Sequence, residues 1–125
     1  MSGRDSEREG WDYFLDLDRQ SIAYDSGYWA TFRVSAVCPS EGRPHGIQYS
    51  LSLHDENGDR LLGYNNAHAV DVAKGPARKS KRPKAFDHIN RRGRKPVPHA
   101  FTTPFKLLED FFTDVDKILR EEGVL

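Results

Sequence analysis

The sequence contains very little cysteine and none of the short motifs that hold metals or nucleotides. Its one cysteine, Cys38, can form no internal disulfide and has no second thiol with which to share a zinc site. The five histidines occur in no HxH or HExxH spacing, and the glycines form neither a GxxxxGK[ST] nor a GxGxxG run. These absences argue against a disulfide scaffold, a zinc finger and nucleotide-dependent kinase or dehydrogenase chemistry.

Long hydrophobic runs are also absent. No segment approaches the ~20 uninterrupted apolar residues that a membrane helix needs, and the N-terminal MSGRDSEREG is too polar for a signal peptide. Of the 125 residues, 37% are hydrophobic and 30% are charged, which is a balance typical of a small packed domain. We therefore expect residues 1–125 to form one domain, with a cytoplasmic location and no membrane contact.

Acidic residues are almost missing from one part of the chain. Between Lys74 and Lys95 there are ten lysines or arginines and a single acid, Asp87, so this basic segment carries +9. The whole chain has 19 basic and 19 acidic residues, so the remainder has 9 against 18 and carries −9. Clustered cations displace counterions from a nucleic-acid backbone, so the basic segment indicates a nucleic-acid-binding surface. A solvated loop without such a role is the alternative.

Two hairpins are predicted in the first half of the chain. The turn DSG separates SIAY from YWATFRVSAV, whose apolar and polar residues alternate as in a strand with one buried face. The Asn57–Gly58 pair favours a tight turn, so IQYSLSLH and RLLGY are expected to be antiparallel neighbours. Residues 1–10 are polar and are expected to fray, and residues 72–84 are expected to form a mobile basic loop.

The C-terminal segment has the pattern of an amphipathic helix over residues 104–122. Thr103 can cap this helix, Pro104 suits its first position, and Gly123 ends it. The apolar residues recur at intervals of three and four: Leu108, Phe111, Phe112, Val115, Ile118 and Leu119. The expected fold is therefore α+β, with an antiparallel sheet of four to six strands packed against one long C-terminal helix.

The stretch AFDHINRRGRKPVP, residues 85–98, contains side chains that suit chemistry on RNA. Cleavage without a metal needs a base for the 2′-hydroxyl, an acid for the departing 5′-oxygen, and cations for the phosphoryl group. Histidine suits the first two roles because its pKa lies near neutrality. We expect His88 to be the principal acid or base, Asp87 to orient it, and His68 to be the second imidazole.

The cations of the same stretch are candidates for binding the phosphates. Arg91 and Arg92 can bind a phosphate bidentately. The nucleic-acid-binding set is Arg91, Arg92, Arg94, Lys95 and Lys84. A metal site is the rival chemical reading, because His68, Asp87, His88 and Asp55 have suitable donor atoms, but no ligand spacing supports it. We expect no metal and no cofactor.

The order of several short motifs resembles the TumE family, the toxin components of bacterial toxin-antitoxin operons. The chain contains YSLSLHDENGDRLLGYNNAH, then DHIN followed by an arginine, then HAFTTPFKLLEDFFTDVDKIL. The family pattern is a YSL strand, a (Y/F)DN motif, a DHxH motif and a C-terminal helix that opens with L(L/M)xDF. The resemblance covers about residues 20–122, and no single motif is diagnostic.

Carried over residue by residue, the resemblance points to Asn66, Asp87, His88, Asp110 and Phe111. Two positions depart from the family pattern. Asn65 stands where (Y/F)DN has an aspartate, and Asn90 stands where DHxH has its second histidine. If the activity needs both imidazoles, this chain is weakened or uses His68 instead.

The resemblance implies a toxin, and toxins of such operons are often endoribonucleases. By that analogy we expect a metal-independent endoribonuclease that acts on RNA. The implied partner is a cognate antitoxin, plausibly a helix-turn-helix protein, and a homodimer is possible. The alternative is a non-catalytic protein that binds nucleic acid or the antitoxin through the basic segment.

Overall fold

The computed structural model describes residues 3–41, 43–66, 70–71 and 84–125, and it describes side chains for 10–41, 43–66 and 86–125. His68 and the expected mobile loop, apart from Lys84, lie outside these residues. Lys84 lies in a strand of a separate two-stranded sheet, in which β5 (Val70–Asp71) pairs with β6 (Lys84–Ala85). The rest of the strands form one larger sheet.

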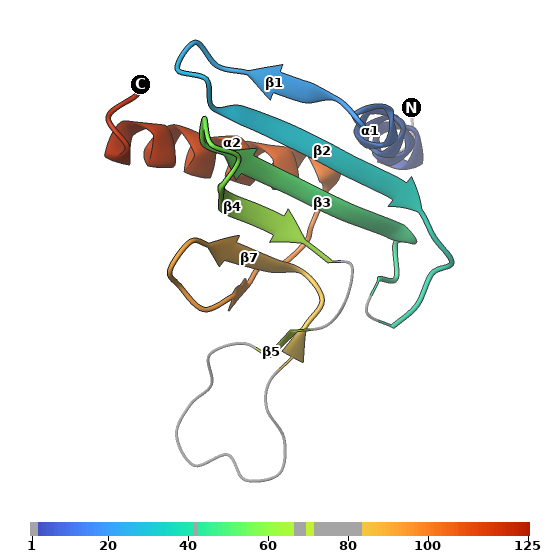
Figure 1. The fold of residues 1–125 in the computed structure, drawn as a ribbon. Coiled ribbons are helices and arrows are strands. Elements are labelled where there is room, and N and C mark those ends of the chain that lie inside the picture. The colour runs from blue at the N-terminus through green and yellow to red at the C-terminus, as the bar shows by residue number, and fades with distance from the viewer. Residues whose placement is uncertain (1–2, 42, 67–69, 72–83) are drawn as a thin grey trace, which may run out of the picture.

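This sheet has six strands, every neighbouring pair of which is antiparallel. Their order across the sheet is β1-β2-β3-β4-β7-β8 (Figure 1). The strands are β1 (Ser21–Ala23), β2 (Trp29–Ala36), β3 (Ile47–His54), β4 (Arg60–Asn65), β7 (His88–Arg91) and β8 (Val97–Pro98). The predicted α+β class and the number of strands are confirmed.

Both predicted hairpins are present. β1 pairs with β2, and β3 pairs with β4 through the turn that contains Asn57 and Gly58. Gly58 has a φ of 89°, a left-handed conformation that glycine adopts without a steric penalty. The Asp55 carboxylate accepts hydrogen bonds from the backbone N–H groups of Asn57 and Asp59 at 2.9 and 3.0 Å, which holds the turn closed.

The long C-terminal helix is α2 (Pro104–Glu121), one residue shorter than predicted. The Thr103 hydroxyl accepts a hydrogen bond from the Lys106 N–H at 3.1 Å, so Thr103 is the N-cap. Gly123 follows the helix with a φ of 75°. The buried residues of α2 are Pro104, Leu107, Leu108, Phe111, Val115, Ile118 and Leu119. The predicted apolar stripe therefore packs against the sheet.

The N-terminal segment differs from the expectation of fraying. Helix α1 (Gly3–Asp16) begins within it, and Gly10 and Phe14 are buried. Trp11, Phe14 and Leu15 recur at intervals of three and four, so the helix presents an apolar stripe to the core despite its polar beginning. Tertiary packing of that stripe explains why a mostly polar segment is helical.

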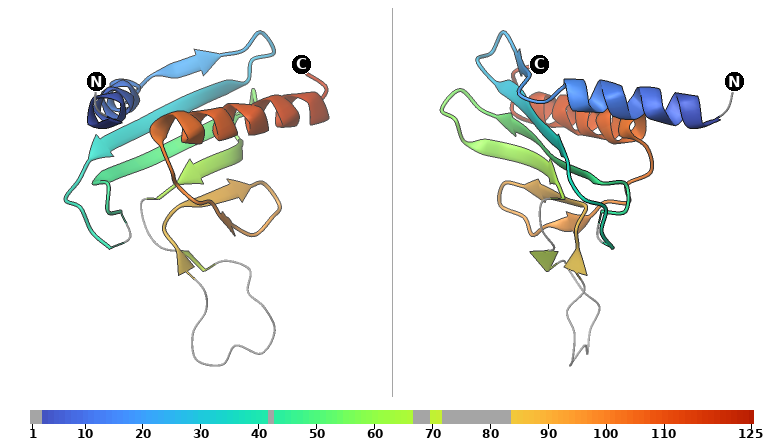
Figure 2. Two further views of the ribbon diagram at one scale, coloured as in Figure 1. Left: turned by 180° about the vertical axis from the view of Figure 1, so that it is seen from behind. Right: turned by 90° about the vertical axis from the view of Figure 1, so that its right-hand side faces the viewer.

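Helices α1 and α2 lie on the same side of the sheet and are here called the helix layer (Figure 2). The side of the sheet that α2 does not cover faces the viewer in Figure 1 and is here called the open face. Successive side chains of a strand point to opposite faces. Ala30, Phe32 and Val34 of β2 are buried under the helix layer, so Thr31 and Arg33 belong to the open face.

Candidate functional site

Asp87 and His88, predicted to act together, point to opposite sides of the sheet. The Asp87 carboxylate accepts a hydrogen bond of 2.6 Å from the Tyr49 hydroxyl. Tyr49 is buried and is paired with Val34, on the side of the helix layer. His88 is paired with Asn65, whose neighbour Ser50 is paired with Arg33 of the open face. Asp87 therefore positions the Tyr49 phenol and does not orient His88.

A backbone carbonyl orients His88 instead. The His88 Nδ1 lies 2.8 Å from the carbonyl oxygen of Phe86. A carbonyl only accepts, so Nδ1 carries the proton, and Nε2 is the basic nitrogen of the neutral ring. His88 is only 2% exposed, so a phosphate reaches Nε2 only after the groups that cover it move.

His88 lies in a row of directly paired residues on the open face, and Pro98 of β8 is its partner on the other side. The row is Arg33, Ser50, Asn65 and His88, in β2, β3, β4 and β7. Neighbouring strands are ~4.8 Å apart, so the row spans ~14 Å. It joins a guanidinium to an imidazole across two short polar side chains.

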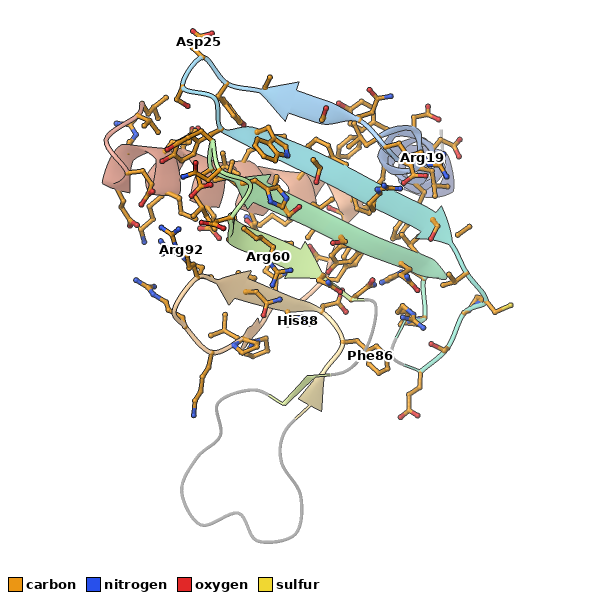
Figure 3. All side chains as sticks on the ribbon, viewed as in Figure 1. Arg19, Asp25, Arg60, Phe86, His88 and Arg92 are labelled. Atoms are coloured by element: carbon orange, nitrogen blue, oxygen red, sulfur yellow. The ribbon has the colours of Figure 1, made fainter. Side chains whose placement is uncertain are left out.

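Arg60 adds a second guanidinium to the open face. Its side chain lies over Gly63, where a Cβ would meet the Arg60 guanidinium nitrogen at 3.3 Å. Figure 3 shows Arg60 and His88 on neighbouring strands of the open face. Within the part of the chain that the structure describes, neither Arg33 nor Arg60 forms an ion pair, and no open-face position of β1 to β4 or β7 is a carboxylate.

Arg19 extends this cationic surface toward β1. Arg19 and Arg33 together line two neighbouring hollows of about 330 and 470 Å³. Arg19 has a φ of 66°, a left-handed conformation that few residues other than glycine adopt. The Asp18 carboxylate beside it accepts the Val34 N–H at 2.8 Å. The Asp18 carboxylate, next to Arg19 in the sequence, is therefore already hydrogen-bonded to the backbone of β2.

The predicted phosphate-binding residues do not form one cluster. Arg91 donates to the Glu121 carboxylate of α2 at 2.8 Å, and this contact holds the pKa of Glu121 below its usual value. Arg92 lies 3.6 Å from Asp55 and 3.8 Å from Glu122. Arg94 and Lys95 are exposed between β7 and β8. Arg91 and Arg92 thus link the sheet to the end of the helix layer and to a turn.

Asn66, a residue of the family motif, supports the fold. It is fully buried, and both the oxygen and the nitrogen of its side-chain amide bond to the backbone of β3. The Oδ1 atom accepts from the Tyr49 N–H at 2.8 Å, and Nδ2 donates to the Ile47 carbonyl at 2.9 Å. Asn66 therefore supplies the backbone partners that β4 no longer provides beyond its end.

Asp110 and Phe111 of the helix motif also support the fold. Phe111 is fully buried and packs edge-on against Phe32 and Tyr64. The Asp110 carboxylate lies 3.0 Å from His99 Nε2 and 3.0 Å from Lys106 Nζ. These bonds, the one from His99 above all, lower the pKa of Asp110 against the opposing effect of its burial.

The sequence alone indicates no functional role for Arg33, Arg60 or Arg19. The alternation of β2 indicates that Arg33 faces away from the core, but only the register of four strands brings it into one row with His88. Among the described residues, no group of three or more His, Cys, Asp or Glu could hold a metal ion. In the predicted metal set, Asp87 and His88 lie on opposite faces of the sheet.

The fold and the site define a class of protein: a small α+β domain with one cationic, open sheet face and one face covered by helices. The chain matches the model of the family described as Toxin TumE over residues 15–119, and it therefore belongs to the TumE toxin family. The resemblance drawn from the motifs is confirmed. No curated protein and no solved structure matches the chain.

Membership of a toxin family gives the chain a toxin role and implies an antitoxin as its partner. Among the helices that the structure describes, none combines the length and the apolar character needed to cross a membrane.

Proposed function

We propose that this toxin binds RNA across the open face of its sheet and cleaves it without a metal, with His88 as the general base. The observation that carries the proposal is the row of Arg33, Ser50, Asn65 and His88, in which the Phe86 carbonyl orients the imidazole. Arg33 and Arg60 carry charges that no described carboxylate neutralises, so they suit a phosphate backbone.

The proposed reaction is an attack by the RNA on its own phosphodiester. His88 Nε2 removes the proton of a 2′-hydroxyl, and the resulting oxygen forms a bond to phosphorus. The bond from phosphorus to the 5′-oxygen breaks, which leaves a 2′,3′-cyclic phosphate and a 5′-hydroxyl. The departing oxygen takes up a proton, and His68 remains the predicted donor. Arginine guanidinium groups stabilise the charge on the phosphoryl oxygens.

The first test compares two histidines of the open face. His88→Ala should reduce RNA cleavage about a hundredfold or more, because a general base contributes on that scale. His54→Ala is the matched control, since His54 stacks on Trp29 with ring centroids 5.2 Å apart and lies outside the row of His88. Conditional expression in a bacterium, followed by mapping of RNA ends, measures both. Equal cleavage by the two variants would contradict the catalytic proposal.

A second test removes the cations. The double variant Arg33→Ala, Arg60→Ala should weaken binding of single-stranded RNA and lower the slope of log K against log salt by about 1.4, since each phosphate contact on a single strand contributes about 0.7. Fluorescence anisotropy with a labelled oligonucleotide at several salt concentrations gives this slope. An unchanged slope would remove the open face as the RNA site.

A non-catalytic toxin that binds nucleic acid or the antitoxin through the basic segment is the second candidate. The burial of His88 and the use of Asp87 by Tyr49 favour it. It predicts that His88→Ala stays fully toxic, whereas neutralising Arg91, Arg92, Arg94 and Lys95 abolishes growth arrest. The antitoxin, proposed here to be a helix-turn-helix protein, is co-expressed in a parallel culture to show that growth arrest is toxin-specific.

A further inference from the structure

The helix layer carries a pair of exposed aromatic side chains that the proposed RNA site does not use. Tyr13 of α1 is 53% exposed, and Phe105 of α2 is 55% exposed. Their ring centroids lie 6.0 Å apart, so the two rings form one apolar surface where the helices meet. The Phe105 ring also lies against Gly10, where a Cβ would meet it at 3.2 Å. A side chain at Gly10 would displace this ring.

The aromatic pair continues along α2 as a stripe. Phe105, Glu109, Phe112 and Asp116 recur at intervals of four, three and four residues, so they share one side of the helix. Phe112 is half-buried and packs against Phe32, while Glu109 and Asp116 are exposed. The stripe therefore alternates aromatic and acidic side chains.

The helix layer is acidic as a whole. The residues of α1 include two basic and five acidic side chains, and those of α2 include three basic and five acidic ones, so the two helices carry a net charge of −5. Asp12 and Asp16 are exposed beside Tyr13. The Lys106 ammonium lies 3.0 Å from Asp110 and 3.6 Å from Glu109, so this cation is already shared by two carboxylates.

We infer that this surface, consisting of Tyr13, Phe105, Phe112 and the surrounding acids Asp12, Asp16, Glu109 and Asp116, is where the antitoxin docks. The segment that fits it is basic and carries at least one apolar anchor residue for the aromatic pair. Exposed aromatic side chains surrounded by charge are typical anchors of a protein interface. The charge complementarity selects a basic segment over an acidic one.

The position of this surface separates antitoxin binding from the proposed binding and cleavage of RNA. It lies on the helix layer (Figure 2), whereas Arg60 and His88 lie on the open face (Figure 3). Arg33 belongs to the open face by its position in β2. The inference depends on membership of a toxin family and not on the proposed RNA chemistry. Variants of one face should therefore leave the function of the other face intact.

The experiment measures binding of the full-length toxin to the purified product of the adjacent antitoxin gene by surface plasmon resonance. Phe105→Ser should raise the Kd at least about thirty-fold, as loss of an interface hot spot does. The toxicity of Phe105→Ser without antitoxin should equal that of the unmodified chain. Co-expressed antitoxin should therefore fail to rescue growth only for this variant.

Matched controls remove exposed apolar side chains elsewhere. Val97 of β8 is 46% exposed and Ile22 of β1 is 39% exposed, so Val97→Ser and Ile22→Ser remove similar surface outside the helix layer. Both should bind the antitoxin normally. If either control weakens binding as much as Phe105→Ser, or if Phe105→Ser binds normally, the surface is not the docking site.

A second variant keeps the apolar surface and changes only its charge. Asp12→Asn combined with Asp116→Asn should slow association and weaken the salt dependence of the Kd, because both carboxylates attract the basic segment. Unchanged association would overturn the charge argument. A homodimer that Phe105→Ser dissociates, detected by light scattering while antitoxin binding stays normal, would show that a second copy occupies the surface instead.

Discussion

The two sides of the sheet differ in what their side chains contact. Under the helix layer, Tyr49 and Tyr64 donate from their hydroxyls to the carboxylates of Asp87 and Asp114. Burial above all, and then these carboxylates, raise the pKa of both phenols well above the usual value. On the open face, Arg33 and Arg60 form no ion pair within the described residues. The phenols and carboxylates under the helix layer therefore pair with one another, whereas Arg33 and Arg60 present their charge on the open face.

The difference shows that closeness in sequence is a poor guide to shared function. Asp87 and His88 are adjacent, yet Asp87 precedes β7 and bonds to Tyr49 on the side of the helix layer, whereas His88 begins β7 on the open face. Arg33 and His88 are 55 positions apart in numbering, yet the register places them in one row.

The largest effect should come from the core under the helix layer. Phe111→Ala should lower the free energy of unfolding by about 3–4 kcal/mol, because Phe111 is fully buried between Phe32 and Tyr64. Arg33→Ala on the open face should change it by less than about 0.5 kcal/mol. Urea denaturation followed by tryptophan fluorescence measures both, and a loss below about 1 kcal/mol for Phe111→Ala would contradict the assigned packing.

A somewhat smaller loss should follow removal of the Asn66 amide. Asn66→Ala leaves the Tyr49 N–H and the Ile47 carbonyl without their side-chain partners, which should cost about 2–3 kcal/mol. Asn57→Ala in the exposed turn is the control and should stay within about 0.5 kcal/mol. Thermal unfolding by circular dichroism distinguishes them. Equal midpoints would show that Asn66 does not complete the ladder of β3.

The partner of Asp87 can be identified by a double-mutant cycle. In the free energy of unfolding, measured by urea denaturation, Tyr49→Phe and Asp87→Asn should show a coupling energy of about 1–2 kcal/mol. One charge-assisted hydrogen bond of 2.6 Å joins the two side chains. Asp87→Asn and His88→Ala should be coupled by less than about 0.5 kcal/mol. Coupling of Asp87 to His88 alone would restore the pairing that the sequence suggested.

The smallest effect concerns the pH dependence of the helix layer. The folded pKa of Asp110 lies below its ordinary value of 3.8, chiefly because His99 hydrogen-bonds to the carboxylate. The ionised form therefore adds stability above about pH 4, and this stability is lost as the pH falls through the folded pKa. Asp110→Asn should cost about 1 kcal/mol at pH 7, since the group is partly exposed, and progressively less as the pH falls below about 4.

The measurement for Asp110 is a series of urea unfolding curves from pH 2 to pH 7. Asp12→Asn, an exposed substitution on α1, is the control and should shift stability by less than about 0.5 kcal/mol throughout. A difference between Asp110→Asn and the unmodified chain that stays constant with pH would show that the carboxylate charge is not responsible.

Much of the fold could be predicted because local patterns and tertiary packing agree. Thr103 and Pro104 begin α2, Gly123 follows it, and Asn57 and Gly58 close the hairpin, all as their residue types indicate. The expectation for residues 1–10 differed from the structure, in which α1 begins at Gly3, because the polar composition of that segment concealed the apolar stripe that follows it.

The candidate site was harder to predict than the fold. The sequence singled out Asp87, His88, Arg91 and Arg92 because they are close together along the chain. The structure assigns Asp87 to Tyr49 and Arg91 to Glu121, and it brings Arg33 and Arg60 to the face of His88. The density of charged residues along a sequence does not predict which of them form ion pairs in the folded protein.

The pattern of residues along the chain indicates the two hairpins, the C-terminal helix, the buried side of β2 and the resemblance to a toxin family. These properties depend on contacts within a few residues and on the alternation of apolar side chains. The pattern does not indicate which carboxylates neutralise which cations, which nitrogen of His88 carries the proton, or which residues share the open face. Those properties depend on the register between distant strands, and a shift of one residue would exchange the two faces.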